Sequence, residues 1–332
     1  MIKKKYLIIG GLGYIGSTLI PFLLNNNKNL FIHCLDNLIY KQKIDPKLKK
    51  LRRLKINKFD LRKFGKIKKK FKDYNAVIIL GGLVGDPITK KYKLLSESIN
   101  KRGIAKLIDE LNGLNLKKLI FISTCSNYGL SKTNIKLKET SKLNPQSRYA
   151  KAKIFIEKHL LNKKGKVDYA ATILRFATAF GVSPRMRFDL TINDFVRQLF
   201  FKKKLYVYDK NTSRPYCHVK DFARLIDKVL RAKKEKVNFQ IFNCGSNKNN
   251  FSKKKIILKL KKIFNFPEIV YLKGDQDKRN YIVDFSKIRK VLNFKTKYDV
   301  YYGIKEIIKD LKKGKFSDLN NFSDRLGNYK IY

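Results

Sequence analysis

Residues 6–24 of this chain read Tyr-Leu-Ile-Ile-Gly-Gly-Leu-Gly-Tyr-Ile-Gly-Ser-Thr-Leu-Ile-Pro-Phe-Leu-Leu and contain no charged side chain. They directly follow three lysines at 3–5. One interpretation is a signal peptide or membrane anchor, which begins with basic residues and continues with an apolar run. The other is a buried strand, a glycine turn and a helix that together bind a dinucleotide.

The glycine spacing and the next apolar segment favour the dinucleotide interpretation. Gly10, Gly13 and Gly16 recur every third residue after the strand-like run at 6–9, and no small-residue cleavage site follows. A second apolar run leads into Asp36, twenty residues after Gly16. Glycines permit a tight turn and let backbone N–H groups approach a pyrophosphate at the N-terminus of the following helix. We therefore expect a βαβ unit here.

The composition indicates a cytoplasmic protein without a metal centre. After residue 24, no apolar run in the 332 residues is long enough to span a bilayer. The three histidines show no metal-ligand spacing, so we expect no metal. The cysteines are isolated from one another, which suits a reducing compartment. They are Cys34, Cys125, Cys217 and Cys244.

The net charge of +51 comes mainly from lysine, which supplies 62 of the 77 basic residues. Proteins that read nucleic acids usually cluster their basic residues and favour arginine. Here lysine is spread along the chain beside frequent asparagine and isoleucine, a residue bias typical of AT-rich coding sequences. The alternative is attraction to anions such as RNA or membranes. We expect neither a nucleic-acid nor a membrane partner.

Strands and helices alternate along the first half, which is typical of a parallel sheet covered on both faces. The expected strands there are 6–9, 30–35, 55–59, 76–80, 118–123 and 169–175, and the expected helices are 14–26, 61–72, 94–112 and 147–162. The second half predicts helices at 190–203, 219–231, 252–264 and 299–312, with short strands at 205–208, 240–243 and 268–272.

Tyr149 and Lys153 are candidates for acid–base chemistry. They lie four residues apart, so they share one face of the expected helix. A nearby ammonium favours a phenolate and lowers the pKa of a tyrosine, and Thr124 can bind the same substrate oxygen. The pattern Y-x-x-x-K alone has no weight, because it starts at five tyrosines. They are Tyr128, Tyr149, Tyr206, Tyr216 and Tyr301. Only Tyr149 follows a Ser/Thr-rich strand end and opens a helix.

Together these residues resemble the extended short-chain dehydrogenase/reductases. Within them, the chain is similar to the NAD-dependent epimerase/dehydratase family acting on nucleotide sugars, of the UDP-glucose 4-epimerase type. The resemblance covers roughly residues 5–312. Further stretches that resemble the family are 81–87, 174–181, 184–189 and 214–221. The fold it implies is α/β, a Rossmann-type doubly wound parallel sheet with a smaller α/β substrate-binding lobe.

The resemblance implies an NAD cofactor. The cofactor-binding residues it implies are Gly10, Gly13, Tyr14, Ile15, Gly16, Asp36, Asn37, Asp60, Leu61, Gly81, Gly82, Leu83, Asn100, Tyr149 and Lys153. Asp36 would accept a hydrogen bond from the adenosine ribose and repel the phosphate of NADP. Asp36 can instead be a simple turn residue, and Asp60, expected near the adenine, can equally be a helix N-cap.

The implied substrate is a nucleoside-diphosphate sugar. The residues implied to bind it are Asp86, Thr124, Thr178, Arg185, Arg187 and Arg214. Arginine suits a diphosphate because its guanidinium binds oxygen pairs in a bidentate manner. A surface salt bridge is the alternative role for Arg214, and Arg175 can be purely structural.

Two positions depart from the family pattern. Thr178 stands where many relatives have asparagine, which loosens the assignment of the nucleotide. Cys125 and Ser126 stand where the sugar 4,6-dehydratases carry Asp-Glu. Without those carboxylates, acid–base removal of water lacks its agents, which argues against a dehydratase.

The expected function is NAD-dependent epimerisation of a nucleotide sugar through a transient 4-keto sugar, with Thr124, Tyr149 and Lys153 as catalytic residues. The alternatives are a nucleotide-sugar dehydrogenase or ketoreductase and a non-catalytic NAD-binding member of the family. By resemblance we expect a homodimer. The expected domains are a Rossmann domain at 1–175, a partly interleaved substrate lobe at 176–314 and a surface tail at 315–332.

Overall fold

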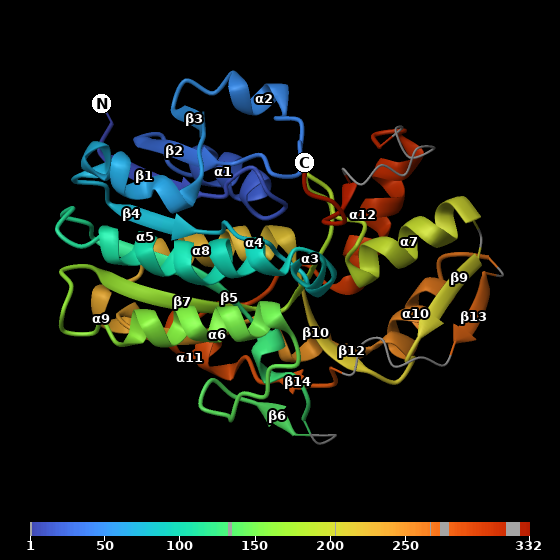
Figure 1. The fold of residues 1–332 in the computed structure, drawn as a ribbon. Helices are drawn as coiled ribbons and strands as arrows, with labels where there is room; N and C mark the ends of the chain where they lie inside the picture. Colours follow the sequence, from blue (N-terminus) through green and yellow to red (C-terminus); the bar gives the residue numbers. More distant parts are fainter. Residues whose placement is uncertain (1, 132–134, 203, 266, 273–278, 317–325) are drawn as a thin grey trace.

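A seven-stranded sheet, parallel at every pairing, forms the centre of the computed structural model (Figure 1). The model describes residues 2–131, 135–202, 204–265, 267–272, 279–316 and 326–332. In spatial order the strands are β11 (Gln240–Cys244), β7 (Ala170–Phe176), β5 (Lys118–Thr124), β4 (Ala76–Ile79), β1 (Lys4–Ile9), β2 (Leu30–Asp36) and β3 (Leu54–Lys58). The order reverses between β1 and β4, where ligands bind in open α/β sheets.

The strands are apolar on both faces because both faces are covered. In β5, Leu119 and Phe121 point into one core, whereas Ile120 and Ile122 point into the other. Successive side chains on a strand alternate between faces, so a strand buried on both sides becomes an uninterrupted apolar run. This confirms the Rossmann-type α/β fold expected from the sequence.

Helices from both halves of the chain cover the two faces. The first core contains side chains of α1, α8 and α11, and the second contains side chains of α5 and α6, which lie in front of the sheet in Figure 1. The helices of this unit are α1 (Gly16–Asn25), α2 (Pro46–Lys49), α3 (Asp86–Lys91), α4 (Lys93–Glu97), α5 (Ile104–Glu110), α6 (Arg148–Leu161), α8 (Val219–Arg231), α9 (Lys234–Val237) and α11 (Ser286–Leu292).

Two expected helices differ in detail. The segment 61–72 is not an α-helix but two 3-10 helices, η1 (Leu61–Lys66) and η2 (Lys68–Phe71). Gly65 and the neighbouring like-charged lysines disfavour a regular α-helix there. The segment 94–112 is helical, but a π-helical turn, η3 (Ser98–Gly103), separates α4 from α5.

The smaller lobe is a separate core of short strands and three helices, α7 (Thr191–Lys202), α10 (Lys253–Lys261) and α12 (Val300–Lys312). The short strands and 3-10 turns outside the main sheet are β6 (Lys136–Leu137), β8 (Thr178–Phe180), β9 (Lys204–Tyr208), β10 (Ser213–His218), β12 (Asn250–Ser252), β13 (Glu268–Leu272), β14 (Ile282–Val283), η4 (Cys125–Tyr128) and η5 (Asn247–Asn249). Because α8, β11 and α11 belong to the large unit, the two lobes are interleaved along the chain.

The described end of the surface tail expected at 315–332 is only partly at the surface, since Gly327 and Asn328 are buried whereas Lys330 and Tyr332 are exposed. Residues 326–332 pack between the two lobes, and Asn328 is only 6% exposed. Residues 317–325 lie outside the described part. All four cysteines are free and buried. Across the described ranges, no helix is both long enough and apolar enough to cross a bilayer.

Candidate active site

A cavity of about 540 Å³ opens at the carboxyl ends of β1, β2, β4 and β5, and the smaller lobe forms its opposite wall. Its size is typical of small-molecule sites. Every residue that the sequence analysis named for the site lines this cavity, with the exception of Asn100. Residues that are far apart in the sequence therefore line one cavity next to the point where the strand order reverses.

The glycine turn after β1 shapes the floor of the cavity. Gly10 has φ +77°, and a Cβ there would lie 2.4 Å from the Cα of Gly81. A Cβ on Gly16 would lie 2.5 Å from the Cα of Gly11, whereas one on Gly13 would meet only the Gly10 oxygen at 3.5 Å. Gly10 and Gly16 are thus required for packing, and Gly13 keeps the cavity side open. Helix α1 begins at Gly16, which lines the cavity, so the positive end of the helix dipole lies where an anion is favoured.

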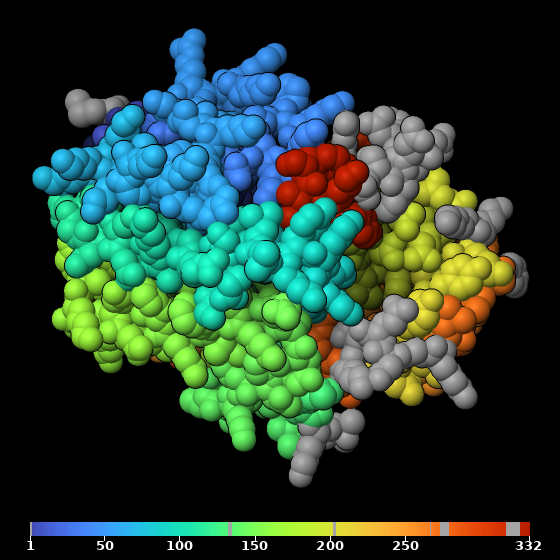
Figure 2. All heavy atoms as spheres, in the orientation of Figure 1, coloured from blue at the N-terminus to red at the C-terminus, as the bar shows by residue number. Residues whose placement is uncertain are grey.

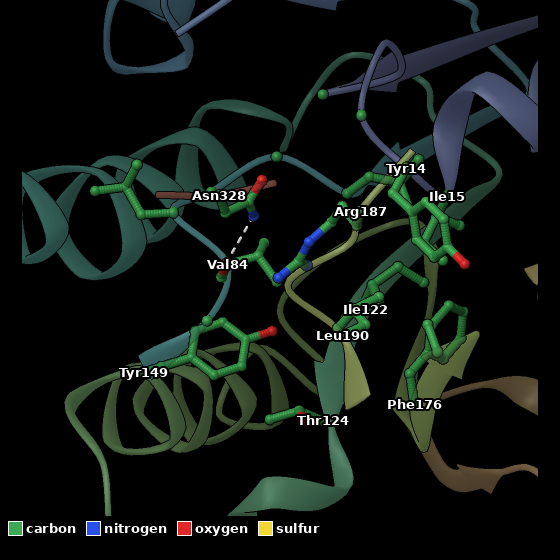
Figure 3. A pocket seen from close by; sticks show the side chains of 18 of the residues that line it. Tyr14, Ile15, Val84, Ile122, Thr124, Tyr149, Phe176, Arg187, Leu190 and Asn328 are labelled. Carbon is green, nitrogen blue, oxygen red and sulfur yellow. Dashed lines mark hydrogen bonds between the residues drawn. The ribbon is translucent and has the colours of Figure 1, made fainter. Parts of the chain in front are cut away.

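Tyr14 in this turn is a link between the lobes. Its hydroxyl donates to the oxygen of Gly181 at 2.6 Å and accepts from Nδ2 of Asn193 at 3.2 Å. Ser183 Oγ donates to the Tyr14 carbonyl at 2.7 Å. Burial raises the pKa of Tyr14. The ring borders the cavity, but the phenol is occupied elsewhere and points away from Tyr149 (Figure 3).

Asp36 ends β2 and borders the cavity beside Asn37. Its carboxylate accepts from the backbone N–H groups of Leu12 at 2.9 Å and Leu38 at 2.8 Å. Burial raises its pKa, and these two N–H groups and the Arg185 guanidinium oppose that rise. Asp36 is therefore more than a turn residue, because it connects the glycine turn to the loop after β2.

Asp60 fills the N-cap role that the sequence left open. Its Oδ1 accepts from the Arg62 N–H at 3.0 Å, and Oδ2 pairs with Arg62 Nη2 at 2.5 Å. Hydrogen bonds from Arg62 lower its pKa. Asp60 and Leu61 also line the cavity, so Asp60 caps the 3-10 helix and borders the site at the same time.

Asn100 acts behind the wall. Its Oδ1 accepts from the Leu83 N–H at 2.7 Å, and its Nδ2 donates to the Leu83 oxygen at 2.8 Å. A Cβ on Gly82, which has φ +146°, would lie 2.8 Å from the same Oδ1. Asn100 therefore holds the loop of Gly81, Gly82 and Leu83 in place and does not itself face the cavity. The expectation of direct cofactor binding by Asn100 is corrected accordingly.

The three expected catalytic residues face the same cavity. Thr124 is the last residue of β5, whereas Tyr149 and Lys153 lie one turn apart at the start of α6, which Ser147 caps. The Tyr149 hydroxyl points into the cavity, on the side where Thr124 lies (Figure 3). Lys153 Nζ donates to the oxygen of Ile122 at 2.7 Å and lies 5.7 Å from the centre of the Tyr149 ring.

The pKa values in this site differ from the expectation for Tyr149. Burial raises the pKa of Tyr149, and the Arg187 guanidinium, not Lys153, opposes this most strongly. Burial also lowers the pKa of Lys153 to about 7. A partly neutral lysine gives up much of its ability to stabilise a phenolate. The two side chains have the expected arrangement, but desolvation dominates their protonation.

Two arginines reach the centre of the cavity from the segment before α7. Arg187 lies between the Val84 loop and Tyr14 (Figure 3), and its Nε donates to Oδ1 of Asp189 at 3.0 Å. Arg185 lies 4.9 Å from the ring centre of Tyr40 and donates from Nη2 to the Gly327 oxygen at 2.9 Å. Burial lowers the pKa of Arg185 to about 10.

The other expected substrate residues line the far side. Arg214 is buried, 5.0 Å from the ring centre of Tyr281, so the surface alternative for it is wrong. Asp86 begins α3 and pairs with Arg279 at 2.5 Å, which joins the two lobes across the cavity. Thr178, at the start of β8, also borders the cavity.

Arg175 is structural. Its guanidinium pairs with Glu157 at 2.7 Å and donates to the Tyr128 hydroxyl at 3.0 Å, and both ionic partners are 3% exposed. This network lies behind Thr124 and does not reach the cavity.

Sequence reasoning missed several residues of the wall. They are Tyr40, Gln42, Asp189, Arg279, Tyr281, Asn328 and Tyr329. Arginine is rare beside lysine in this chain, which could have drawn attention to Arg279. Asp189 ends the stretch 184–189 that resembles the family, although it was not named for the site. The remaining five belong to no pattern, and only the folded chain brings them together.

The residues fit a dinucleotide. The floor has a glycine cradle and the N-terminus of a ten-residue helix, and Asp36 offers a carboxylate for a ribose. Among the described residues, Arg185 Nε and Asn328 Oδ1 are buried without a hydrogen-bond partner. A ligand with both acceptor and donor groups would satisfy them.

Comparison with known proteins agrees with this geometry. Residues 6–245 match the model of the NAD dependent epimerase/dehydratase family. A UDP-glucose 4-epimerase from Lactobacillus helveticus is 25% identical over 324 residues, which cover 89% of this chain and 93% of that protein. Another from Cyamopsis tetragonoloba is 26% identical over 344 residues, covering 93% and 94%.

Solved structures share the fold. UDP-glucuronic acid 4-epimerase from Bacillus cereus, in complex with UDP-glucuronic acid and NAD, has a TM-score of 0.81 at 23% identity and covers 93% of this chain and 99% of its own. dTDP-glucose 4,6-dehydratase from Bacillus anthracis, in complex with NAD, has a TM-score of 0.81 at 20% identity, with coverage of 94% and 98%. At these identities the likeness establishes the architecture.

Proposed function

The chain belongs to the NAD-dependent epimerase/dehydratase family, and from this premise we propose that it epimerises a nucleoside-diphosphate sugar through a transient 4-keto sugar. NAD is the cofactor of this family. The observation that carries the proposal is the meeting of Thr124, Tyr149 and Lys153 in one cavity with the glycine turn after β1.

In the proposed reaction, the Tyr149 oxygen takes the proton of the sugar C4 hydroxyl. Thr124 Oγ1 accepts from the Ser126 N–H at 3.1 Å, so its own proton is free to donate to the sugar oxygen. Lys153 uses one N–H on the Ile122 oxygen and, when it is protonated, keeps two more for the cofactor side. NAD held in this site would supply the hydride acceptor and a positive ring that favours the phenolate.

The change of configuration requires the keto sugar to turn inside the cavity while its diphosphate stays bound. Arg187 and Arg214 are buried cations on the lobe opposite the glycine turn, and they are the proposed diphosphate ligands. Tyr149 would then return the proton to the same oxygen once the sugar presents its other face.

Dehydration fits the site less well. Cys125 is buried and donates to the oxygen of Arg175, and Ser126 offers only a hydroxyl to the cavity. No carboxylate follows Thr124 at these two positions. Removal of water needs a general acid at the leaving hydroxyl, so epimerisation is the favoured outcome.

We also propose a homodimer that forms through the outer face of α6 and η3. Phe155 on α6 is 40% exposed, and Lys101 of η3 lies 4.9 Å from the centre of its ring. Leu94 on α4 is 86% exposed. Sedimentation of the native chain and of Phe155→Asp tests this. A native monomer would contradict it.

The function is tested by incubating the purified protein with UDP-glucose, UDP-glucuronic acid or dTDP-glucose. Product configuration is read by NMR and net NADH by absorbance. We expect the C4 epimer of one sugar without net NADH. Stoichiometric NADH would instead indicate a dehydrogenase, and a dehydrated product would contradict the proposal.

Tyr149→Phe should lower turnover about 10²- to 10⁴-fold, the usual contribution of a general acid–base group. The matched control is Tyr301→Phe, which alters the same Y-x-x-x-K pattern on α12 at a residue 40% exposed and outside the cavity. Equal turnover in both variants would remove Tyr149 from the mechanism.

A further inference from the structure

Residues 326–332, here called the closing segment, lie between the two lobes at the cavity. In Figure 2 the end of the chain, in red, fills the space between the blue N-terminal part and the cyan segment. The Tyr332 N–H donates to the oxygen of Ile39 at 3.1 Å, and the Phe188 N–H donates to the Leu326 oxygen at 2.7 Å. The segment thus connects the loop after β2 with the smaller lobe.

Asn328 lines the cavity and carries an unsatisfied acceptor. Its Nδ2 donates to the oxygen of Val84 at 2.8 Å, which fixes the orientation of the amide (Figure 3). Its Oδ1 is buried and has no hydrogen-bond partner among the described residues. A buried carbonyl oxygen without a partner is rare and unfavourable, so this atom is suited to a ligand that donates a hydrogen bond.

Arg185 places the closing segment on the cofactor side of the cavity. The Gly327 oxygen accepts from Arg185 Nη2, and the guanidinium lies over Tyr40, four residues after Asp36. The charges of Arg185 and Asp36 influence each other's pKa. Arg185 Nε has no partner in the part of the chain that the structure describes. Although the resemblance assigns Arg185 to the substrate, its contacts lie beside Asp36.

We propose that Asn328 and Arg185 are cofactor-binding residues, and that the closing segment holds the dinucleotide in the site. Asn328 Oδ1 accepts from a ribose hydroxyl of NAD, and Arg185 Nε donates to a diphosphate oxygen. The proposal rests on the NAD site of the proposed function. It adds a part of the chain that lies outside the glycine turn and the Rossmann sheet.

The test measures NAD itself and not turnover. Wild type, Asn328→Ala and Lys330→Ala are compared for NAD retained through size exclusion and for NADH affinity by fluorescence. Lys330 is the matched control, because it lies in the closing segment and its side chain is exposed. Asn328→Ala loses one buried hydrogen bond, so we expect it to bind NADH about tenfold more weakly than wild type. Lys330→Ala should bind NADH as tightly as wild type.

Hydrogen exchange of residues 326–332 in the wild-type protein is measured with and without NAD. This experiment tests whether the closing segment holds the cofactor even if Asn328→Ala folds poorly. Slower exchange with NAD supports the proposal. Unchanged exchange, or full NAD affinity in Asn328→Ala, overturns it. An absence of epimerase activity would refute the proposed function and leave this result unaffected.

Discussion

Glu157→Gln tests whether the buried network behind Thr124 maintains the site. The Glu157 carboxylate accepts from Asn127 Nδ2 at 2.8 Å and from Ser123 Oγ, and it pairs with Arg175 at 2.7 Å and 3.0 Å. Ser123 directly precedes Thr124 in β5. A neutral amide at 157 leaves the guanidinium of Arg175 without a counter-charge in the core.

The expected loss of stability is large, because removing one partner of a buried pair typically costs about 3–5 kcal/mol. Burial by itself lowers the pKa of Arg175, but hydrogen bonds and charge from Glu157 raise it above its ordinary value. Glu157→Gln removes that support, but Arg175 stays charged because a guanidinium is not deprotonated in proteins. The double variant Glu157→Leu/Arg175→Met removes both charges and should recover much of the loss.

Urea unfolding followed by far-UV circular dichroism measures the free energy of unfolding of wild type, Glu157→Gln, Glu157→Leu, Arg175→Met and the double variant. All of these except Glu157→Gln form the double-mutant cycle. Turnover measured alongside should fall in Glu157→Gln, because Thr124 shifts with its neighbours. A loss of unfolding free energy below about 1 kcal/mol in any of the single variants would refute the reasoning, because a loss that small is typical of a solvated surface pair.

Two further predictions concern a glycine and a carboxylate. Gly10→Ala should abolish NAD retention, because its Cβ would overlap the Cα of Gly81. The control is Gly113→Ala, which also has a positive φ (+76°) but has open space around it, so it should retain NAD. Equal NAD retention in both variants would contradict the role of the glycine turn. Glu306 accepts from His218, Lys220 and the Val182 N–H, which together outweigh burial and lower its pKa to about 2. A depressed carboxyl pKa stabilises the fold above its unfolded value near 4.5, and this contribution is lost as the pH falls toward 2. Glu306→Gln should therefore lower stability at neutral pH and reduce the acid dependence between those values. A variant with the wild-type pH profile in urea unfolding would contradict this.

Local patterns were sufficient for the frame of the molecule. The run at 6–24 predicted β1, the turn and α1, because a strand buried on both faces must be continuously apolar and only glycine adopts the turn at Gly10. Asp36 and Thr124 could be found for the same reason. They end buried strands, and the carboxyl ends of parallel strands meet at one edge of the sheet.

Local patterns failed where neighbours in space decide the outcome. The helix expected at 61–72 became two 3-10 helices. Besides the local cost of a glycine and of neighbouring lysines, a Cβ at Gly65 would lie 2.4 Å from Oε1 of Glu110, so α5 packs closely against this segment. The pKa of Tyr149 rises although Lys153 lies one turn away, because burial depends on residues distant in the sequence. Asn328 shows the same limit, for nothing at 326–332 marks it as part of a site.

By itself, then, the sequence determined the sheet and the glycine cradle, which follow from periodicity and short spacing. It pointed to Thr124, Tyr149 and Lys153 only through their context and their resemblance to a family, and their catalytic role stays a prediction. Only the tertiary structure decided what closes the cavity and which side chains are charged inside it. The cavity is enclosed, and its side chains are removed from water, by contacts between segments as far apart in the sequence as Val84 and Asn328. A pattern of neighbouring residues cannot predict such contacts.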